Sequence, residues 1–192
     1  MPDLIQIDQN LFTLINQGLA NPFFDWLMPY LRNRYFWSPL YLFLFIFFIR
    51  NYAKRGWLLL LFFVLTFAVT DYITSSIIKP GVARLRPCND FNIKNEMRLL
   101  ISCGSGYSFP STHAANHFAL AAFLIDMFYR RWKPIIILAF LWAFSISFAQ
   151  VYVGVHYPLD VIFGAVVGSL LGFIMAGILK TTLAFRTWRS GN

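Results

Sequence analysis

Long apolar runs separated by short polar connections dominate the pattern along the chain. A hydrocarbon core about 30 Å thick is crossed by roughly 20 apolar residues in a helix, and five runs approach that length. These runs cover residues 36–49, 57–78, 114–129, 134–148 and 161–179. The pattern therefore predicts five membrane-spanning helices and an all-α, polytopic membrane bundle.

The segment from Leu4 to Leu31 follows a different pattern. Apolar residues recur at helical spacing between Leu4 and Ile15, as in an amphipathic helix that lies in the membrane interface. Pro22 and Pro29 then break the helical pattern. The polar interruptions are Asp8, Gln9, Asn10, Asn16, Gln17, Asn21 and Asp25. We expect one or two interfacial helices within residues 1–34, with a sixth span as the alternative.

Composition supports the membrane interpretation. Only 12% of the 192 residues are charged and 58% are hydrophobic, whereas soluble domains carry about 25% charged residues. The net charge of +8 comes from basic residues in the connections, and no basic stripe interleaved with aromatic residues is present to follow a nucleic acid. Residues 1–192 contain no linker or internal repeat, so we expect one integral membrane domain that does not bind nucleic acid.

The basic connections predict the orientation. With five spans, the turns at residues 50–55 and 130–133 and the tail from residue 180 all lie on one side, which the positive-inside rule assigns to the cytoplasm. The other side receives Arg32, Arg34, Lys79, Arg84, Arg86, Lys94 and Arg98. The excess of basic residues on the cytoplasmic side is clear only if several of these seven bind an anionic ligand and are left out of the comparison. We therefore expect residues 79–111 to form an extracytoplasmic active-site loop, in the inner membrane of a bacterium.

Three short segments hold most of the reactive side chains, and each lies at the end of an apolar run. They are residues 79–87, 110–113 and 150–160. Arginine and lysine near a helix start form an anion site, and two histidines with a carboxylate supply a nucleophile, an acid and an orienting base. This set suits phosphoryl transfer through a phosphohistidine and requires no metal or cofactor.

The segments read K-x6-R-P, P-S-T-H and A-Q-x5-H-x3-D. Together they resemble the three signatures of the type 2 phosphatidic acid phosphatase (PAP2) family, which dephosphorylates lipid phosphates and diphosphates. The resemblance implies that His156 attacks phosphorus, that Asp160 holds the far ring nitrogen of His156, and that His113 protonates the leaving oxygen and later activates water. It also implies that the phosphoryl oxygens are held by Lys79, Arg86, Ser111 and the backbone N–H groups of Thr112 and His113.

Two positions depart from the family pattern. Thr112 stands where the family has glycine, and Gln150 stands where it has an arginine that is offered to the phosphate. A neutral amide gives weaker hydrogen bonds than a cation. We expect Arg84 to make up part of the missing positive charge.

Four further residues carry expectations of their own. Asp71 lies within a span, where an unpaired charge is costly, so we expect an ion pair with Arg84 or Arg86. His117, one turn after His113, is expected to form a supporting hydrogen bond rather than to ligate a metal. Cys88 and Cys103 would face an oxidising compartment, where we expect them to form a disulfide.

The sequence thus predicts a metal-independent phosphatase that removes the terminal phosphate from a phosphorylated membrane lipid. Undecaprenyl diphosphate, phosphatidic acid, phosphatidylglycerol phosphate and lipid A fit the family resemblance, with a slight preference for an isoprenyl diphosphate. The alternatives are a non-hydrolytic protein that binds or transports lipid phosphates and a lipid-to-lipid phosphotransferase. The membrane lipid is the expected partner, and the sequence does not predict an oligomeric state.

Overall fold

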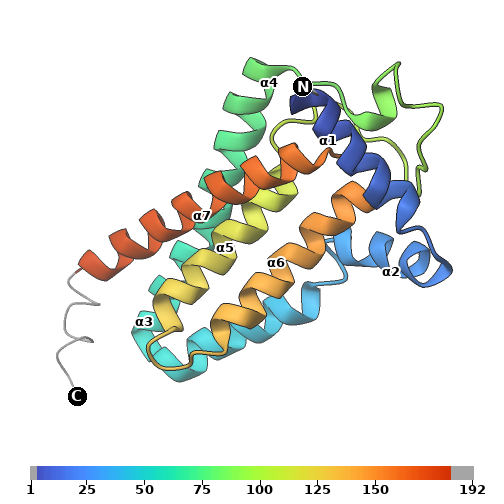
Figure 1. The fold of residues 1–192 in the computed structure, drawn as a ribbon. Coiled ribbons are helices and arrows are strands. Elements are labelled where there is room, and N and C mark those ends of the chain that lie inside the picture. The colour runs from blue at the N-terminus through green and yellow to red at the C-terminus, as the bar shows by residue number, and fades with distance from the viewer. Residues whose placement is uncertain (1–3, 183–192) are drawn as a thin grey trace.

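The computed structural model describes residues 4–182, which are helical with connecting loops and contain no strand (Figure 1). The N-terminal part consists of α1 (Leu4–Thr13), the π-helical segment η1 (Leu14–Gly18) and α2 (Pro22–Arg32). The remaining elements are α3 (Ser38–Tyr72), the π-helical segment η2 (Ile73–Ile78), α4 (Lys79–Val82), the short 3-10 helix η3 (Pro87–Asn89), α5 (Thr112–Phe128), α6 (Ile135–Tyr152) and α7 (Pro158–Thr181). The all-helical fold class predicted from the sequence is confirmed.

Helix α3 is a hairpin of two arms rather than one straight rod. Ala53 has φ 47° and ψ −127°, which breaks the helix between the arms. The arms meet closely at Gly56, where a Cβ would lie 2.1 Å from the carbonyl oxygen of Phe48. The predicted spans 36–49 and 57–78 correspond to these two arms, the second continued by η2.

Helix α5 is the centre of the bundle, with most of its residues buried. It packs most extensively against α7 and also against α6 and α3. Glycines of α7 allow the close approach, because a Cβ at Gly168 or Gly172 would lie 2.1 or 2.2 Å from the carbonyl oxygen of Ala115 or Ala119. Small residues spaced by four are the usual means of bringing membrane helices into backbone contact.

Three stretches are long and apolar enough to cross a membrane: Ser38–Asn89, Ile135–Tyr152 and Pro158–Thr181. The first contains both arms of α3, and α5 with its 17 residues runs through the middle of the bundle. Large apolar side chains on α3, α6 and α7 are exposed to the surroundings, as lipid contact requires. With 10 and 11 residues, α1 and α2 are each too short to be a sixth span.

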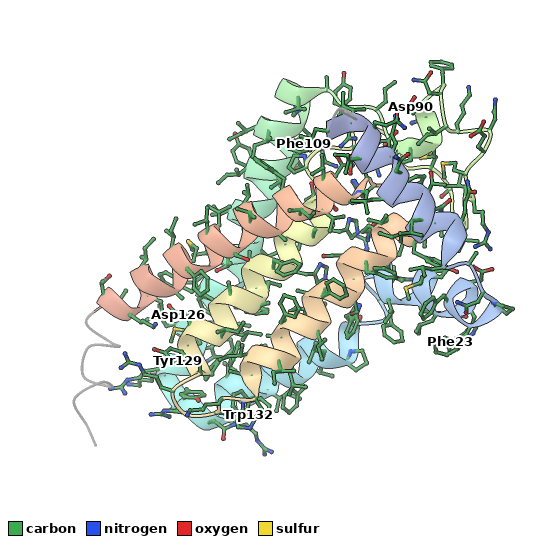
Figure 2. All side chains as sticks on the ribbon, in the orientation of Figure 1. Phe23, Asp90, Phe109, Asp126, Tyr129 and Trp132 are labelled. Carbon is green, nitrogen blue, oxygen red and sulfur yellow. A yellow bond between two sulfur atoms is a disulfide. The ribbon has the colours of Figure 1, made fainter. Side chains whose placement is uncertain are left out.

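The chemically capable segments gather at one end of the bundle (Figures 1 and 2). Helix α4, the loop that follows it, the beginnings of α5 and α7 and the N-terminal helix α1 lie at this end. Figure 2 labels Asp90 there, and it labels Asp126, Tyr129 and Trp132 at the opposite end. The fold therefore brings the three sequence segments that resemble PAP2 signatures to a single end.

Candidate active site

His156 lies in the short connection between α6 and α7. Its backbone N–H and that of Val155 both donate to the carbonyl oxygen of Gln150, over 3.3 and 3.2 Å. Gly154 makes the turn with a φ of 91°, in the left-handed region that glycine adopts without strain. This compact turn holds the imidazole in the interior, where only 2% of His156 is exposed.

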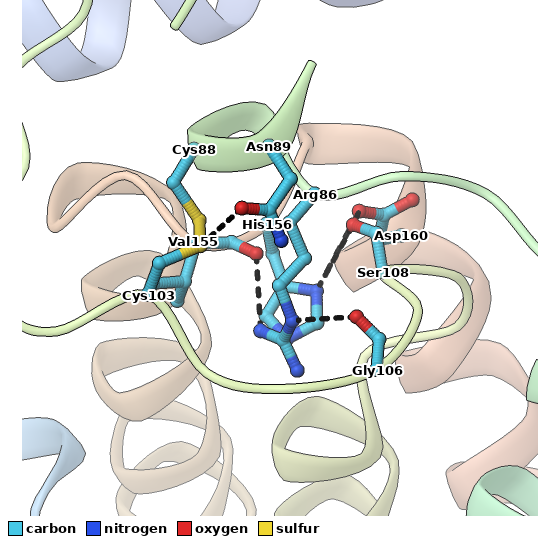
Figure 3. The surroundings of a disulfide bond; sticks show 9 residues. All are labelled: Arg86, Cys88, Asn89, Cys103, Gly106, Ser108, Val155, His156 and Asp160. Atoms are coloured by element: carbon cyan, nitrogen blue, oxygen red, sulfur yellow. Dashed lines mark hydrogen bonds and ion pairs between the residues drawn. A yellow bond between two sulfur atoms is a disulfide. The ribbon is translucent and has the colours of Figure 1, made fainter.

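Asp160, in the first turn of α7, lies behind the imidazole. Its Oδ2 is 3.5 Å from Nδ1 of His156. The same oxygen accepts hydrogen bonds from the backbone N–H of Tyr157, over 2.8 Å, and from the hydroxyl of Ser108. Figure 3 shows Ser108 and Asp160 beside the His156 ring. Because Nδ1 faces the carboxylate, Nε2 is the ring nitrogen that faces away from it and is available for reaction.

The imidazole of His156 is neutral near pH 7. Burial lowers its pKa from 6.5 to about 4, and the charges of Arg86 and Lys79 act in the same direction. The hydrogen bond and charge of Asp160 oppose this decrease only in part. A neutral ring keeps the lone pair that a nitrogen nucleophile requires.

Arg86 lies against the reactive side of His156. Its Nη1 is 3.5 Å from Nε2 of His156 and donates to the carbonyl oxygen of Val155 over 3.3 Å. Its Nε donates to the carbonyl oxygen of Gly106 over 3.3 Å (Figure 3). A disulfide joins Cys88, two residues after Arg86, to Cys103. The disulfide thus ties the segment that carries Arg86 to the segment that leads to Gly106.

The second histidine lies at the beginning of α5. His113 is partly buried, and its carbonyl oxygen is 2.8 Å from Nδ1 of His117. Nε2 of His117 is 3.2 Å from the hydroxyl of Tyr41, so both ring nitrogens of His117 have hydrogen-bond partners. Within residues 4–182, no group of three or more His, Cys, Asp or Glu side chains is arranged to hold a metal ion.

A cavity of about 750 Å³ joins this charged end to the interior of the α3 hairpin. Its polar wall includes Lys79, Arg86, Thr112, His113 and His156. Its apolar wall comes from both arms of α3, through Leu44, Phe45, Phe48, Leu60, Phe63, Val64 and Phe67. A single cavity with a cationic part and an aromatic part suits an anionic group attached to an apolar chain.

Comparison with known families identifies the architecture. The model of the PAP2 superfamily matches residues 57–183, which include all three signature-like segments. The chain belongs to the PAP2 superfamily.

Two curated relatives that match most of this PAP2 protein are named as phosphatases. It is 36% identical over 177 residues to a lipid A 4'-phosphatase of Bacteroides thetaiotaomicron. This match covers 89% of this chain and 76% of the relative. It is 33% identical over 180 residues to an undecaprenyl-diphosphatase of Sulfolobus acidocaldarius, covering 92% of this chain and 81% of that one. The chain is thus a membrane phosphatase of the PAP2 class.

Two solved structures have the same fold. The crystal structure of Aquifex aeolicus LpxE aligns with a TM-score of 0.67 at 28% identity, over 89% of this chain and 95% of that one. A transmembrane PAP2 type phosphatidylglycerolphosphate phosphatase from Bacillus subtilis aligns with a TM-score of 0.69 at 23% identity, over 95% of this chain and 90% of that one. The PAP2 fold therefore extends beyond the part of the chain that the family model matches.

Arg84 does not line the cavity, contrary to the expectation that it adds positive charge for the phosphate. Its Nη1 is 2.7 Å from Oδ1 of Asp160 and its Nη2 is 2.6 Å from Oδ2 of Asp8. The guanidinium also lies 4.0 Å from the centre of the Tyr157 ring. Two carboxylates and an aromatic ring contact this side chain. Arg84 therefore holds Asp160 through the carboxylate oxygen that does not face His156.

Ser111 and Gln150 are also separated from the cavity. The Ser111 hydroxyl caps α5 by accepting from the backbone N–H of Ala114 over 3.4 Å, and the residue is fully buried. Gln150 is fully buried too, and among the described residues neither its amide nitrogen nor its amide oxygen has a hydrogen-bond partner. Neither side chain reaches the cavity wall as the resemblance implied.

Asp71 lines the cavity without the expected arginine partner. Its Oδ1 accepts a hydrogen bond from Nδ2 of Asn116 over 2.9 Å. The predicted ion pair with Arg84 or Arg86 is absent from the described residues, because Arg84 is engaged by two carboxylates and Arg86 by backbone carbonyl oxygens.

Sequence reasoning missed four residues of the site. Ser108 bonds to Asp160, Asp8 bonds to Arg84, and Arg32 and Arg34 line the cavity. For Arg32 and Arg34 a signal existed, because the charge bias required some basic residues on their side to bind an anion. Asp8 had a weaker one, since it is an acidic residue on an otherwise apolar helical face.

Proposed function

We propose that this protein hydrolyses the terminal phosphate of a phosphorylated membrane lipid through a phosphohistidine on His156. The observation that carries the proposal is the arrangement around that ring. Asp160 lies at Nδ1, Arg86 lies at Nε2, and His113 and Lys79 share the same cavity. A neutral nucleophile beside two cations and a second histidine is suited to attack on a phosphate.

In the first step, Nε2 of His156 attacks phosphorus and forms an N–P bond while the P–O bond to the lipid breaks. His113, which is protonated when the negative charge of the phosphate binds beside it, gives its proton to the departing lipid oxygen, and Asp160 stabilises the positive charge that develops on the His156 ring. Lys79 and Arg86 hold the phosphoryl oxygens, whose negative charge they neutralise.

In the second step, water attacks the phosphorus of the phosphohistidine. His113, now neutral, accepts a proton from that water, and the N–P bond breaks to release inorganic phosphate and regenerate neutral His156. Each histidine therefore returns to its starting state after one turnover.

A phosphorylated glycolipid of the lipid A type is the first candidate substrate. Support comes from the 36% identity to the Bacteroides thetaiotaomicron lipid A 4'-phosphatase over most of this chain. The cavity supports a lipid, because its apolar wall lies between the two arms of α3 while its charged wall holds the reactive residues.

An isoprenyl diphosphate is the second candidate. The observation in its favour is 33% identity over 180 residues to an undecaprenyl-diphosphatase. The two candidates differ in the group that departs, a sugar hydroxyl in one and a lipid monophosphate in the other. The phosphate that binds to His156 has the same chemistry in both.

The site end of the bundle faces away from the cytoplasm in our proposal. The opposite end carries the two basic turns, at residues 50–55 and 130–133, as the positive-inside rule requires for the cytoplasmic side. The disulfide lies at the site end, which fits an oxidising compartment. Labelling of a Lys133→Cys variant only after membranes are made permeable supports this orientation, and labelling in intact cells contradicts it.

Phosphate release from detergent-solubilised protein tests the activity. A panel of phosphorylated lipid A, undecaprenyl diphosphate, phosphatidylglycerol phosphate and phosphatidic acid is compared between wild type and His156→Ala. We expect release with wild type and none with His156→Ala, and we expect acid-labile phosphate on wild type in a rapid quench. Binding of these lipids without release would instead support a non-hydrolytic carrier, and appearance of the phosphate on a second lipid would support a phosphotransferase.

A further inference from the structure

Arg32 enters the cavity from outside the signature segments. It is the last residue of α2. The end of α2 is held by the indole N–H of Trp37, which donates to the carbonyl oxygen of Leu31 over 2.7 Å. Farther back, Asp25 of α2 accepts a hydrogen bond from the Tyr152 hydroxyl over 2.7 Å. The helix that carries Arg32 is thus fixed to α6, and the side chain lines the same cavity as His113 and His156.

The guanidinium of Arg32 has no partner among the residues that the structure describes. Within residues 4–182 it forms no ion pair or hydrogen bond, and its Nε is buried without an acceptor. Arg84 and Arg98, by contrast, are each paired with carboxylates at 2.6–2.7 Å. Burial lowers the pKa of Arg32, and the neighbouring charge of Arg86 lowers it further. A partly buried cation beside another cation is unfavourable until an anion binds between them.

Gln150 leaves a deficit of charge that Arg32 is placed to fill. In the PAP2 pattern this position carries an arginine, whereas the neutral side chain of Gln150 is fully buried and does not line the cavity. Lys79 and Arg86 then remain as the cations that the signature segments supply to the cavity. Arg32 lines the same cavity as Arg86 and His113.

We propose that Arg32, at the end of α2, binds the phosphoryl oxygens of the substrate. It supplies the positive charge that an arginine gives in the family pattern and that the neutral Gln150 does not. The proposal rests on the proposed function only in assuming that the anion is a phosphate group. The fork of N–H donors matches phosphate geometry, and the unsatisfied Nε gives it a donor that has no competing acceptor.

Binding of inorganic phosphate and inorganic pyrophosphate to the purified full chain tests this proposal. The variants are Arg32→Gln, Arg32→Lys and, as a matched control, Arg50→Gln, which removes an exposed arginine at the opposite end of the bundle. Loss of one charge-assisted contact is expected to weaken phosphate binding about tenfold or more in Arg32→Gln. We expect partial recovery in Arg32→Lys and no change in Arg50→Gln.

Thermal unfolding separates binding from a structural role. Without phosphate, Arg32→Gln is expected to melt at or above the temperature of wild type, because an unpaired, partly buried cation has been removed. With phosphate, the stabilisation seen in wild type is expected to be smaller in Arg32→Gln. An Arg32→Gln variant that binds phosphate with the affinity of wild type would overturn the proposal. A variant that fails to fold would also overturn it, because Arg32 would then be needed for the fold. Phosphate binding through Arg32 without hydrolysis of any lipid phosphate would contradict only the proposed function.

Discussion

Arg84 donates from Nη1 to Oδ1 of Asp160 over 2.7 Å, on the carboxylate oxygen that does not face His156. Its Nη2 bonds to Asp8 of α1, and the other oxygen of Asp8 accepts from the backbone N–H of Leu159 over 2.9 Å. Asp8 and Leu159 are 151 residues apart in the sequence. The orientation of Asp160 therefore depends on the N-terminal helix as well as on its own.

Replacing Arg84 by glutamine is expected to lower kcat with little change in KM. The side chain contacts Asp160 but does not line the cavity, so its loss disturbs the orientation of the nucleophile and not the binding of phosphate. We expect a decrease of about 10- to 100-fold, as when a group that orients a metal-bound histidine is removed. Steady-state kinetics in mixed micelles measure both constants.

Lys180→Gln is the matched control for Arg84→Gln. It removes an ion pair of 2.6 Å with Asp126 at the opposite end of the bundle and should leave both constants unchanged. Asp8→Asn should resemble Arg84→Gln in a milder form, because Arg84 keeps Asp160. An increase in KM at constant kcat in Arg84→Gln would instead indicate that Arg84 binds the phosphate.

The signature segments predict the core of the site because their reactive residues stand at the ends of apolar runs. If five runs cross the membrane, the alternating direction of the spans places His113 and His156 at the same end of the bundle. Their shared cavity with Lys79 and Arg86 agrees with that reasoning. The direction of Arg84 could not be predicted, since its two carboxylate partners lie 76 residues away on either side.

The N-terminal segment shows a second limit of sequence reasoning. Its apolar spacing predicts a helix, and polar residues such as Asp8 and Asn16 look like interruptions of the pattern. In the structure both are buried. Nδ2 of Asn16 donates to the carbonyl oxygens of Arg98 and Tyr152, over 2.8 Å each. These residues fasten the helix to the site loops, and partners so distant in sequence leave no local signal.

The acid side of the pH profile should report the burial of His156. Burial lowers its pKa to about 4, so the ring is neutral and nucleophilic above that pH and becomes protonated below it. We expect kcat/KM to fall as the pH decreases through about 4, rather than through 6.5. A substrate with a good leaving group, p-nitrophenyl phosphate, reduces the dependence on the acid His113. After correction for the ionisation of the substrate, a midpoint near 6.5 would contradict a buried neutral nucleophile.

Loss of the disulfide should weaken both stability and phosphate binding. The Cys88–Cys103 disulfide ties the segment that carries Arg86 to the segment at Gly104, where a Cβ would lie 3.6 Å from the guanidinium carbon of Arg86. Closing a loop of about 15 residues stabilises a protein by about 3 kcal/mol. The double variant Cys88→Ser, Cys103→Ser should melt at a lower temperature and show a higher KM, because Arg86 is less well fixed.

A reductant provides the control for that variant. Dithiothreitol should lower the melting temperature of wild type toward that of the double serine variant and should leave the variant itself unchanged. Equal melting temperatures for oxidised wild type, reduced wild type and the variant would show that the loop is held by other contacts, such as the hydrogen bond from Arg86 to Gly106.

Gly168→Ala should separate the two helices that carry the opposing halves of the site. The added Cβ would lie 2.1 Å from the carbonyl oxygen of Ala115 and 2.8 Å from its Cα, distances that α5 and α7 can relieve only by moving apart. Overpacking of this kind costs about 1–3 kcal/mol. Since His113 is on α5 and Asp160 on α7, kcat should decrease together with the melting temperature.

Gly177→Ala is the control on α7, because a Cβ there meets no atom within 4 Å. That variant should melt at or slightly above the temperature of wild type, through the better helix propensity of alanine. Equal melting temperatures and equal kcat values for the two variants would contradict the close contact between α5 and α7 at Gly168.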